Sequence, residues 1–264
     1  MMIIDCHTHL GPHNDKDFKA DDLFGSMKQA GIEYSLVIAN RTRGESLSTE
    51  KVIQITEKNS KLKAIGNVEF DTLDVNQIEK LKRYLENKKI FGVKFYLGYE
   101  EFYANDQKLT PLYSFCEKEG YPVVYHTGVL EVGYKGFLKY SHPLTIDSVA
   151  TNFPNLKIII AHMGNPWILD CGAVMLKNEN VYVDLSGFFD EYKPIKEEQI
   201  DYFVKKLWEF QQFVGDFKKC LFGTDWPLYN QKEYVDAVLR LPLSKEESDL
   251  VFWKNAQKIF NLDI

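Results

Sequence analysis

Paired cysteines and long apolar runs are both missing from this chain of 264 residues. Its four cysteines are far apart in sequence and form no CxxC pair, which excludes a zinc ribbon or a thioredoxin-like motif. No stretch approaches about 18 consecutive apolar residues, so the sequence predicts no membrane-spanning helix. Sparse cysteines, and an N-terminus without a basic and then apolar leader, predict a cytoplasmic protein.

Positive charge is also scarce. The chain has 32 Lys and Arg against 38 Asp and Glu, a formal net charge of −6, and no run of basic residues. A nucleic-acid partner is therefore not expected, because phosphate binding needs a basic stripe. A hydrophobic content of 45% is enough to build a large core. We expect a folded protein that binds a small-molecule substrate. Its oligomeric state is left open, and a homodimer is compatible with the sequence.

Eight short apolar runs are distributed along the whole chain. Most are rich in Val, Ile, Tyr or Phe, as strands are. Several, such as residues 157–161, are apolar without alternation, which is typical of parallel strands buried on both faces. The predicted strands are residues 3–6, 34–39, 63–70, 91–96, 122–126, 156–161, 181–185 and 220–223.

Amphipathic helical patterns lie between these runs. They cover residues 21–30, 48–60, 74–87, 110–119, 197–213 and 233–241, and a last one covers 245–260. Repeated alternation of strand and helix predicts an α/β protein, a single-domain (β/α)8 TIM barrel over residues 1–264. The last helix would pack outside the barrel or across its bottom. The alternative is a doubly wound open sheet, which often has a glycine-rich first turn that this chain lacks.

Four histidines and one aspartate fall at the ends of predicted strands. His7 and His9 end the first strand, His126 the fifth and His162 the sixth, and Asp225 follows the eighth. In a barrel these carboxyl ends meet at one face, so we predict that the five side chains form one metal site. Imidazoles with a carboxylate favour Zn, Mn, Fe or Co over Mg or Ca.

The same segments carry a family resemblance. Asp-Cys-His-Thr-His, Tyr-His-Thr-Gly, Ala-His-Met-Gly and Phe-Gly-Thr-Asp-Trp-Pro resemble, in this order, the signatures of strands one, five, six and eight of the amidohydrolase superfamily. The segment 251–260 and Gly-Val-Lys-Phe at 92–95 resemble the amidohydrolase-related branch, which includes aminocarboxymuconate semialdehyde decarboxylase. The resemblance implies a divalent metal, usually zinc, held by His7, His9, His126 and Asp225.

The resemblance also implies roles for these residues. Asp225 would bind the metal and accept a proton from its water, whose pKa a metal lowers to about 7. His162 would either bind a second metal or act as the catalytic acid or base. Lys94 ends the fourth strand, where two-metal members of the superfamily carry a bridging carboxylated lysine. The alternative for Lys94 is a lysine at the barrel mouth that binds substrate.

Substrate contacts are predicted from position alone. Arg41 and Arg43 follow the second strand, and their paired N–H groups could hold an acidic substrate. Tyr96 and Trp226 could wall an apolar pocket, although such residues more often serve packing. Two unusual loops, 128–141 and 188–194, follow strands and would therefore lie on the catalytic face. His13 and His142 lie next to prolines in loops and are predicted as surface residues.

Three functions fit these residues. The first is hydrolysis of a C–N or C–O bond of a small molecule through a metal-bound hydroxide. The second is non-oxidative decarboxylation of an unsaturated or aromatic carboxylic acid at the same site. The third is a non-catalytic metal-binding barrel, which the pattern disfavours because structural zinc sites are usually closed and built with cysteine.

Overall fold

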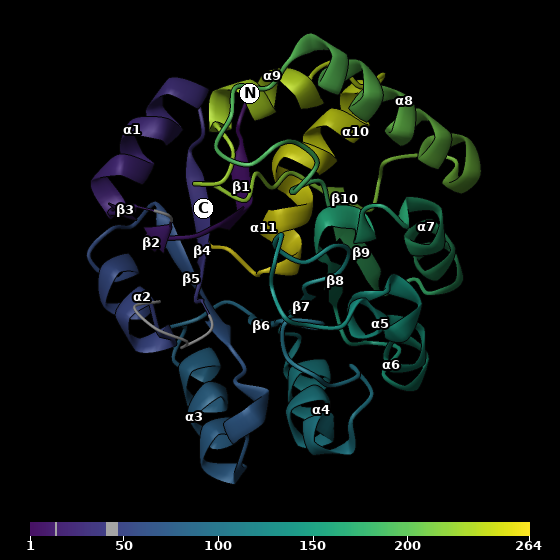
Figure 1. The fold of residues 1–264 in the computed structure, drawn as a ribbon. Helices are drawn as coiled ribbons and strands as arrows, with labels where there is room; N and C mark the ends of the chain where they lie inside the picture. The colour runs from purple at the N-terminus through teal and green to yellow at the C-terminus, as the bar shows by residue number, and fades with distance from the viewer. Residues whose placement is uncertain (14, 41–46) are drawn as a thin grey trace.

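Eight parallel strands form a barrel ringed by helices in the computed structural model, which describes residues 1–13, 15–40 and 47–264 (Figure 1). Each strand pairs with the next along the chain. The predicted (β/α)8 barrel is therefore confirmed. The barrel strands are β1 Ile4–Thr8, β4 Tyr34–Ile38, β5 Leu62–Asn67, β6 Val93–Phe95, β7 Val123–Tyr125, β8 Ile158–Ile160, β9 Val181–Asp184 and β10 Cys220–Leu221.

Backbone hydrogen bonds close the barrel between β1 and the segment that follows β10. The Cys6 amide donates to the Phe222 carbonyl at 3.0 Å, and the Asp225 amide donates to the His7 carbonyl at 2.8 Å. A parallel bridge joins Thr8 to Trp226. These contacts place the ends of the first and last strands side by side, which positions His7 next to Asp225.

Helices alternate with the strands and cover the outside of the barrel (Figure 1). A short antiparallel hairpin, β2 Gly11–His13 and β3 Lys16–Phe18, extends from the end of β1. The helices are α1 Ala20–Ala30, α2 Thr49–Thr56, α3 Val75–Glu86, α4 Thr110–Glu119, α5 Leu138–Ser141, α6 Asp147–Asn152, α7 Ile168–Lys177, α8 Glu197–Val214, α9 Gln231–Val238, α10 Lys245–Asp249 and α11 Asn255–Ile259.

The C-terminal segment closes the interior of the barrel. A π-helical turn, Leu250–Lys254, joins α10 to α11. Ile259 and Phe260 join a buried cluster with inward-facing residues of the strands, including Ile159 of β8. The neighbours of Ile159, Ile158 and Ile160, belong to the outer core beneath the helices. The last helix thus packs across the barrel, one of the two positions predicted for it.

Helices α5, α6 and α7 and the β2–β3 hairpin were not predicted. Helix α7 has no side-chain N-cap and buries five of its ten residues, so its sequence carries neither a start signal nor a clear polar face. The β2–β3 hairpin is only three residues per strand, too short for an alternating pattern to be recognised. Within the described part of the chain, no helix has the length and apolar character needed to cross a membrane.

Gly128 lies where the chain leaves β7 and allows two loops to touch. Its φ is +92°, and a Cβ there would lie 2.4 Å from the Asn165 carbonyl oxygen. Gly133 has a similar φ of +84° but nothing within 4 Å of its Cβ position.

We expect Gly133→Ala to lower the free energy of unfolding by about 1–2 kcal/mol, because alanine is strained in the left-handed region. Gly128→Ala should cost about 1–3 kcal/mol more because of the clash. Equal losses in urea denaturation would contradict this packing.

Candidate functional site

The predicted ligands line one cavity at the carboxyl ends of the strands. Its volume is about 320 Å³. All five predicted ligands contribute to its wall, and all are less than a tenth exposed. The prediction that they converge is therefore confirmed, while their roles stay predictions. The wall consists of His7, His9, Pro12, His13, Asn40, Lys94, Tyr96, Tyr99, His126, Glu131, His162, Glu191, Tyr192, Asp225 and Leu228.

Asp184, the last residue of β9, fixes the orientation of His7 and of the segment carrying His162. The His7 Nδ1 atom lies 2.9 Å from Asp184 Oδ2, so the proton is on Nδ1 and the lone pair of Nε2 faces the cavity. The other oxygen, Asp184 Oδ1, accepts the His162 amide at 3.0 Å. Ser186 also donates to Oδ1 and faces His162 Nδ1 at 2.8 Å.

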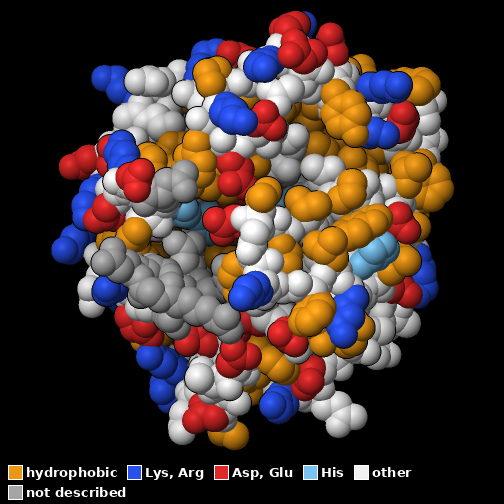
Figure 2. Space-filling view, viewed as in Figure 1, with side chains coloured by type: hydrophobic (Ala, Val, Ile, Leu, Met, Phe, Trp, Pro, Cys, Tyr) orange, Lys and Arg blue, Asp and Glu red, His pale blue; other side chains and the backbone are white. Residues whose placement is uncertain are grey.

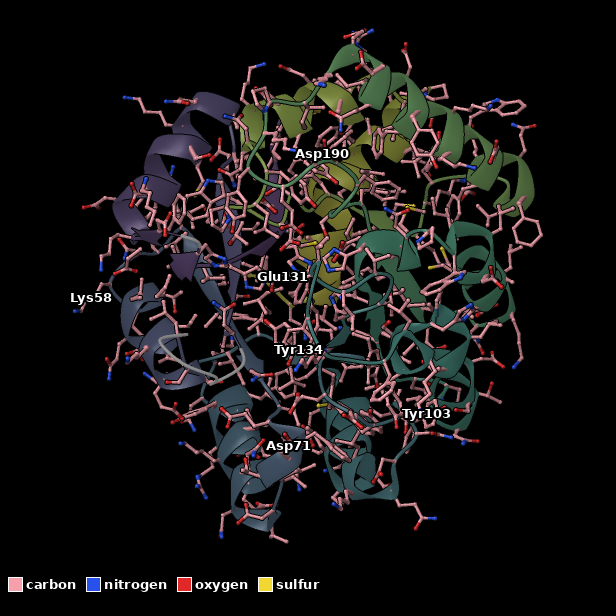
Figure 3. All side chains as sticks on the ribbon, in the orientation of Figure 1. Lys58, Asp71, Tyr103, Glu131, Tyr134 and Asp190 are labelled. Carbon is pink, nitrogen blue, oxygen red and sulfur yellow. The ribbon has the colours of Figure 1, made fainter. Side chains whose placement is uncertain are left out.

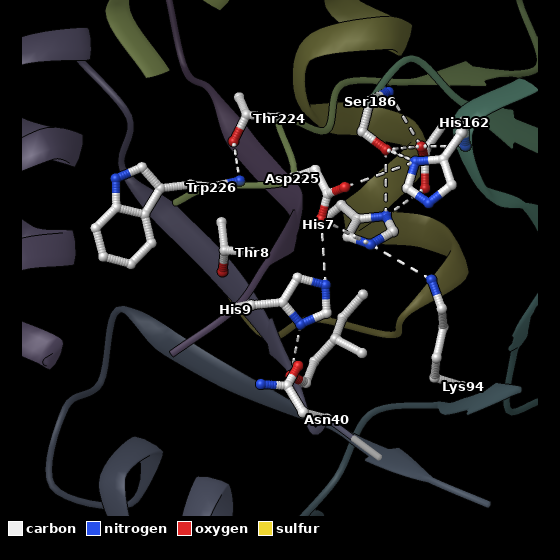
Figure 4. Close-up of polar contacts among 12 residues, drawn as sticks. His7, Thr8, His9, Asn40, Lys94, His162, Ser186, Thr224, Asp225 and Trp226 are labelled. Atoms are coloured by element: carbon white, nitrogen blue, oxygen red, sulfur yellow. Dashed lines mark hydrogen bonds and ion pairs between the residues drawn. The ribbon is translucent and has the colours of Figure 1, made fainter. Parts of the chain in front are cut away.

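His9 is oriented in the same way by a different acceptor. Its Nδ1 lies 3.2 Å from the Ile38 carbonyl oxygen, which leaves Nε2 directed at Asp225 (Figure 4). The His9 Nε2 atom is 3.2 Å from Asp225 Oδ1, and His7 Nε2 is 3.5 Å from the same oxygen. One carboxylate oxygen therefore faces two imidazole nitrogens that a metal could join.

His126 lies beside this group. Its ring centroid is 5.0 Å from that of His162. Its Nε2 atom faces the Val129 carbonyl oxygen at 3.2 Å, which leaves Nδ1 as the atom that could accept a metal. His126 is thus close to the site that we predicted for it, with one of its two nitrogens engaged by the loop after β7.

Two of the predicted ligands have an unusual backbone conformation. His162 has a φ of 60° and Asp225 a φ of 62°, both in the left-handed region that non-glycine residues rarely adopt. Gly187 makes room for the turn at His162, because a Cβ there would lie 2.7 Å from His162 Nδ1. Such strain, about 1–3 kcal/mol per residue, is concentrated at functional sites.

Burial and mutual contact set the protonation of the cluster. Burial lowers the pKa of His162 to about 3, although Asp225 opposes the shift. Burial also lowers the pKa of His7, with Lys94 adding to the effect. Burial by itself would raise the pKa of Asp225. The imidazoles of His7, His9 and His162 outweigh this effect and hold its pKa well below the usual range. At neutral pH His7 and His162 are therefore neutral and Asp225 is ionised, the forms that bind a metal.

Lys94 extends into the same cavity from β6. Its side chain is 1% exposed, and its Nζ atom lies 3.3 Å from His7 Nε2 (Figure 4). Burial lowers the pKa of Lys94 to about 8, while Asp184 and Asp225 oppose the shift. Most of the population is thus cationic at neutral pH. Beside it, Tyr96 lines the cavity as predicted and donates its hydroxyl to the Ala39 carbonyl at 2.9 Å.

The other predicted substrate contacts are placed differently. Trp226 points away from Asp225 and packs against Phe18, with ring centroids 5.3 Å apart, so among the described residues it is not part of the cavity wall (Figure 4). Arg41 and Arg43 lie outside the described residues. His13 was predicted at the surface but lines the cavity, because the unpredicted hairpin folds it back toward His9.

The donor set fits a divalent transition metal. His7, His162 and Asp225 each offer one ligand atom, and these atoms lie within 4.8 Å of one another, the one such group among the described residues. His9 adds a fourth ligand atom, its Nε2, which lies 3.2 Å from Asp225 Oδ1. Imidazole nitrogens with one carboxylate match zinc, manganese, iron or cobalt.

The comparison with known families agrees with this geometry. The model of the family described as "Amidohydrolase" matches residues 65–262, about three quarters of the chain. The chain belongs to the amidohydrolase family. Its relatives in this superfamily include decarboxylases, as the motif resemblance implied. The chain is therefore an enzyme.

Individual relatives share little sequence identity with this chain. A curated γ-resorcylate decarboxylase from Polaromonas is 26% identical over 130 residues, which cover 42% of this chain and 36% of that protein. The match thus spans about a third of the relative. A zinc-bound amidohydrolase from Burkholderia multivorans superposes with a TM-score of 0.75 at 15% identity, covering 99% and 100% of the two chains. A manganese-bound dihydroxybenzoic acid decarboxylase from Polaromonas has a TM-score of 0.68 at 16% identity, covering 100% and 97%. These two similarities show the fold.

Sequence reasoning missed the residues that orient the ligands in this amidohydrolase. Asp184 lies at the end of the seventh predicted strand, 181–185, and Ser186 follows it, at the same barrel face as the histidines. A carboxylate at a strand end was the available signal. It was overlooked because no histidine accompanies it in sequence, and its partner His7 lies 177 residues away.

Asp184 offers a test of this arrangement. The variant Asp184→Asn keeps the size of the side chain but removes the charge that makes His7 a better ligand. We expect metal affinity, measured by competition with a chromophoric chelator, to fall about 10- to 100-fold. The exposed Asp201→Asn on α8 is the matched control. Unchanged affinity in Asp184→Asn would show that Asp184 does not support the metal centre.

Proposed function

We propose that this enzyme removes CO₂ non-oxidatively from a small aromatic carboxylic acid, with a single divalent metal, zinc or manganese, in the cavity at the barrel mouth. The similarity to γ-resorcylate decarboxylase is the observation that carries the proposal. It supports decarboxylation over the hydrolysis that the sequence motifs placed first. We also propose the cytoplasm as the location of the enzyme.

The cavity suits such a substrate. A volume of about 320 Å³ lies at the small end of the range for ligand pockets, about 300–1,000 Å³. Tyr96, Tyr99 and Tyr192 contribute to its wall, and aromatic walls favour a planar ring. Lys94 places a buried positive charge at the inner end of the cavity. A ring with one carboxylate can therefore be held by its apolar faces and by its charge.

A divalent metal, when bound, acts as a Lewis acid that polarises the substrate oxygen atoms it contacts. Lys94 attracts the substrate carboxylate and orients the carbon that carries it. Asp225 accepts a proton from a substrate hydroxyl or from solvent and delivers it to this ring carbon. The new C–H bond uses a π pair of the ring. The C–C bond to the carboxylate then breaks, its electron pair restores the aromatic ring, and CO₂ leaves.

The other buried residues hold this geometry. Asp184 and Ser186 keep His7 and His162 in one orientation, so the donors do not have to reorganise during the reaction. With a single metal, His7, His9, His126 and Asp225 would hold it, and His162, which remains neutral, can accept a hydrogen bond from a substrate hydroxyl. Because the ligand residues are all less than a tenth exposed, bulk water has little access to the ring carbon that takes the proton.

Asp225→Asn tests the proposal. The amide cannot carry the proton, so we expect kcat for CO₂ release to fall by about 10²–10⁴ while the fold is retained. The assay would use γ-resorcylate and other hydroxybenzoates with zinc or manganese present. Asp190→Asn, exposed on the same barrel face, is the matched control and should keep the wild-type rate.

A parallel assay on aryl esters and lactones separates the two reaction classes. Hydrolysis of these compounds by the wild-type enzyme, with no CO₂ released from any hydroxybenzoate, would replace decarboxylation by hydrolysis. A wild-type rate in Asp225→Asn would instead remove Asp225 from the proton transfer.

A further inference from the structure

Two glutamates border the outer part of the catalytic cavity. Glu131 belongs to the long loop after β7, and Glu191 belongs to the loop after β9. Both line the main cavity and also a smaller hollow of about 70 Å³ next to it. In the space-filling view acidic side chains border the hollow in which a histidine is visible (Figure 2). Figure 3 shows Glu131 over the centre of the barrel. We call these two residues the acidic pair.

The backbone around the acidic pair is held in place. The Glu131 amide donates to the Tyr99 hydroxyl at 2.9 Å, and the Tyr134 hydroxyl of the same loop donates to the Tyr99 carbonyl at 3.2 Å. On the other side, the Tyr192 amide donates to the Leu228 carbonyl at 2.7 Å. The two carboxylates therefore project from loops fixed to the barrel rather than from free chain ends.

Among the described residues, no lysine or arginine forms an ion pair with Glu131 or Glu191, whereas several other surface acids, such as Glu50 and Asp147, have lysine partners. The pKa of Glu191 is raised, first by burial and then by repulsion from Asp225 and Glu131. The described residues thus make the outer part of the cavity negative, whereas Lys94 makes the inner end positive.

We propose that the acidic pair selects the substrate class: an aromatic acid with one carboxylate, carrying hydrogen-bond donors and no second carboxylate at the opposite end of its ring. This inference rests on the proposed function. The single carboxylate lies toward Lys94, so the far end of the ring faces Glu131 and Glu191. A hydroxyl there can donate to a glutamate oxygen, whereas a second carboxylate meets two like charges.

The size of this effect follows from Coulomb's law. Like charges a few ångströms apart at a partly solvated site repel by about 1–2 kcal/mol, or about tenfold in affinity for each glutamate. The repulsion should weaken as salt is raised, since the screening length is about 10 Å at 0.1 M and about 3 Å at 1 M. Lost packing or lost hydrogen bonds would not show this dependence on salt.

The test is a comparison of two ligands that differ in one group. Salicylate has one carboxylate, and 2-hydroxyterephthalate has a second one on the opposite ring carbon. Calorimetric binding to the metal-loaded enzyme is measured for the wild type, for Glu131→Gln and Glu191→Gln, and for the double variant. The matched control is Glu179→Gln with Glu198→Gln, which removes the same charge from exposed sites elsewhere.

We expect the double variant to bind the diacid at least tenfold more tightly than the wild type does, with the affinity for salicylate changed less than threefold. The single variants should lie between, the control pair should match the wild type, and 1 M salt should remove most of the difference. An unchanged diacid-to-monoacid ratio in the double variant would overturn the inference. So would the absence of salicylate binding to the wild type.

Binding does not require turnover, so the two proposals can fail separately. Absence of CO₂ release with the predicted binding ratio would refute the decarboxylase and keep the acidic pair as a charge filter. CO₂ release with an unchanged diacid-to-monoacid binding ratio would keep the decarboxylase and refute the charge filter.

Discussion

Hydrogen bonds between β1 and the segment after β10 close the barrel, and they also join the two halves of the candidate metal centre. His7 lies on the first strand and His9 directly follows it, whereas Asp225 lies in the segment after the last strand, 216 residues after His9. The Asp225 amide donates to the His7 carbonyl at 2.8 Å, and the His9 amide donates to the Trp226 carbonyl at 2.7 Å. Each donor is therefore positioned by the ladder that defines the fold. Loosening this seam would separate the carboxylate from both imidazoles.

The site combines opposite electrostatic demands within one cavity. Its inner end holds neutral imidazoles, an ionised carboxylate and a buried lysine, each with a fixed partner, because an unpaired buried polar group costs about 1–3 kcal/mol. Asp184 satisfies several donors at once and so allows two histidines to be buried in one orientation. The outer end keeps two carboxylates without cationic partners among the described residues. Charge thus changes sign along the path that a substrate would take.

The sequence was sufficient for the barrel and for five residues that converge on the cavity, but not for the residues that orient them. Apolar runs without alternation predicted the strands, and five residues at strand ends predicted the cavity, because strand ends of a barrel meet by geometry. Helix α7 was missed since it lacks a cap and a polar face. Trp226 was misplaced because the turn after β10 rotates it toward Phe18. Asp184 was overlooked because its role depends on a partner that is adjacent only in the folded chain.

Metal content per chain tests the central claim, a single metal held by the joined strand ends. The protein would be purified without added metal and its metal measured by elemental analysis, beside the double variant His7→Ala with His9→Ala. The account predicts about one divalent transition metal per wild-type chain and a loss of most of it in the variant, with circular dichroism unchanged. Two metals per chain, or undiminished metal in the folded double variant, would contradict it.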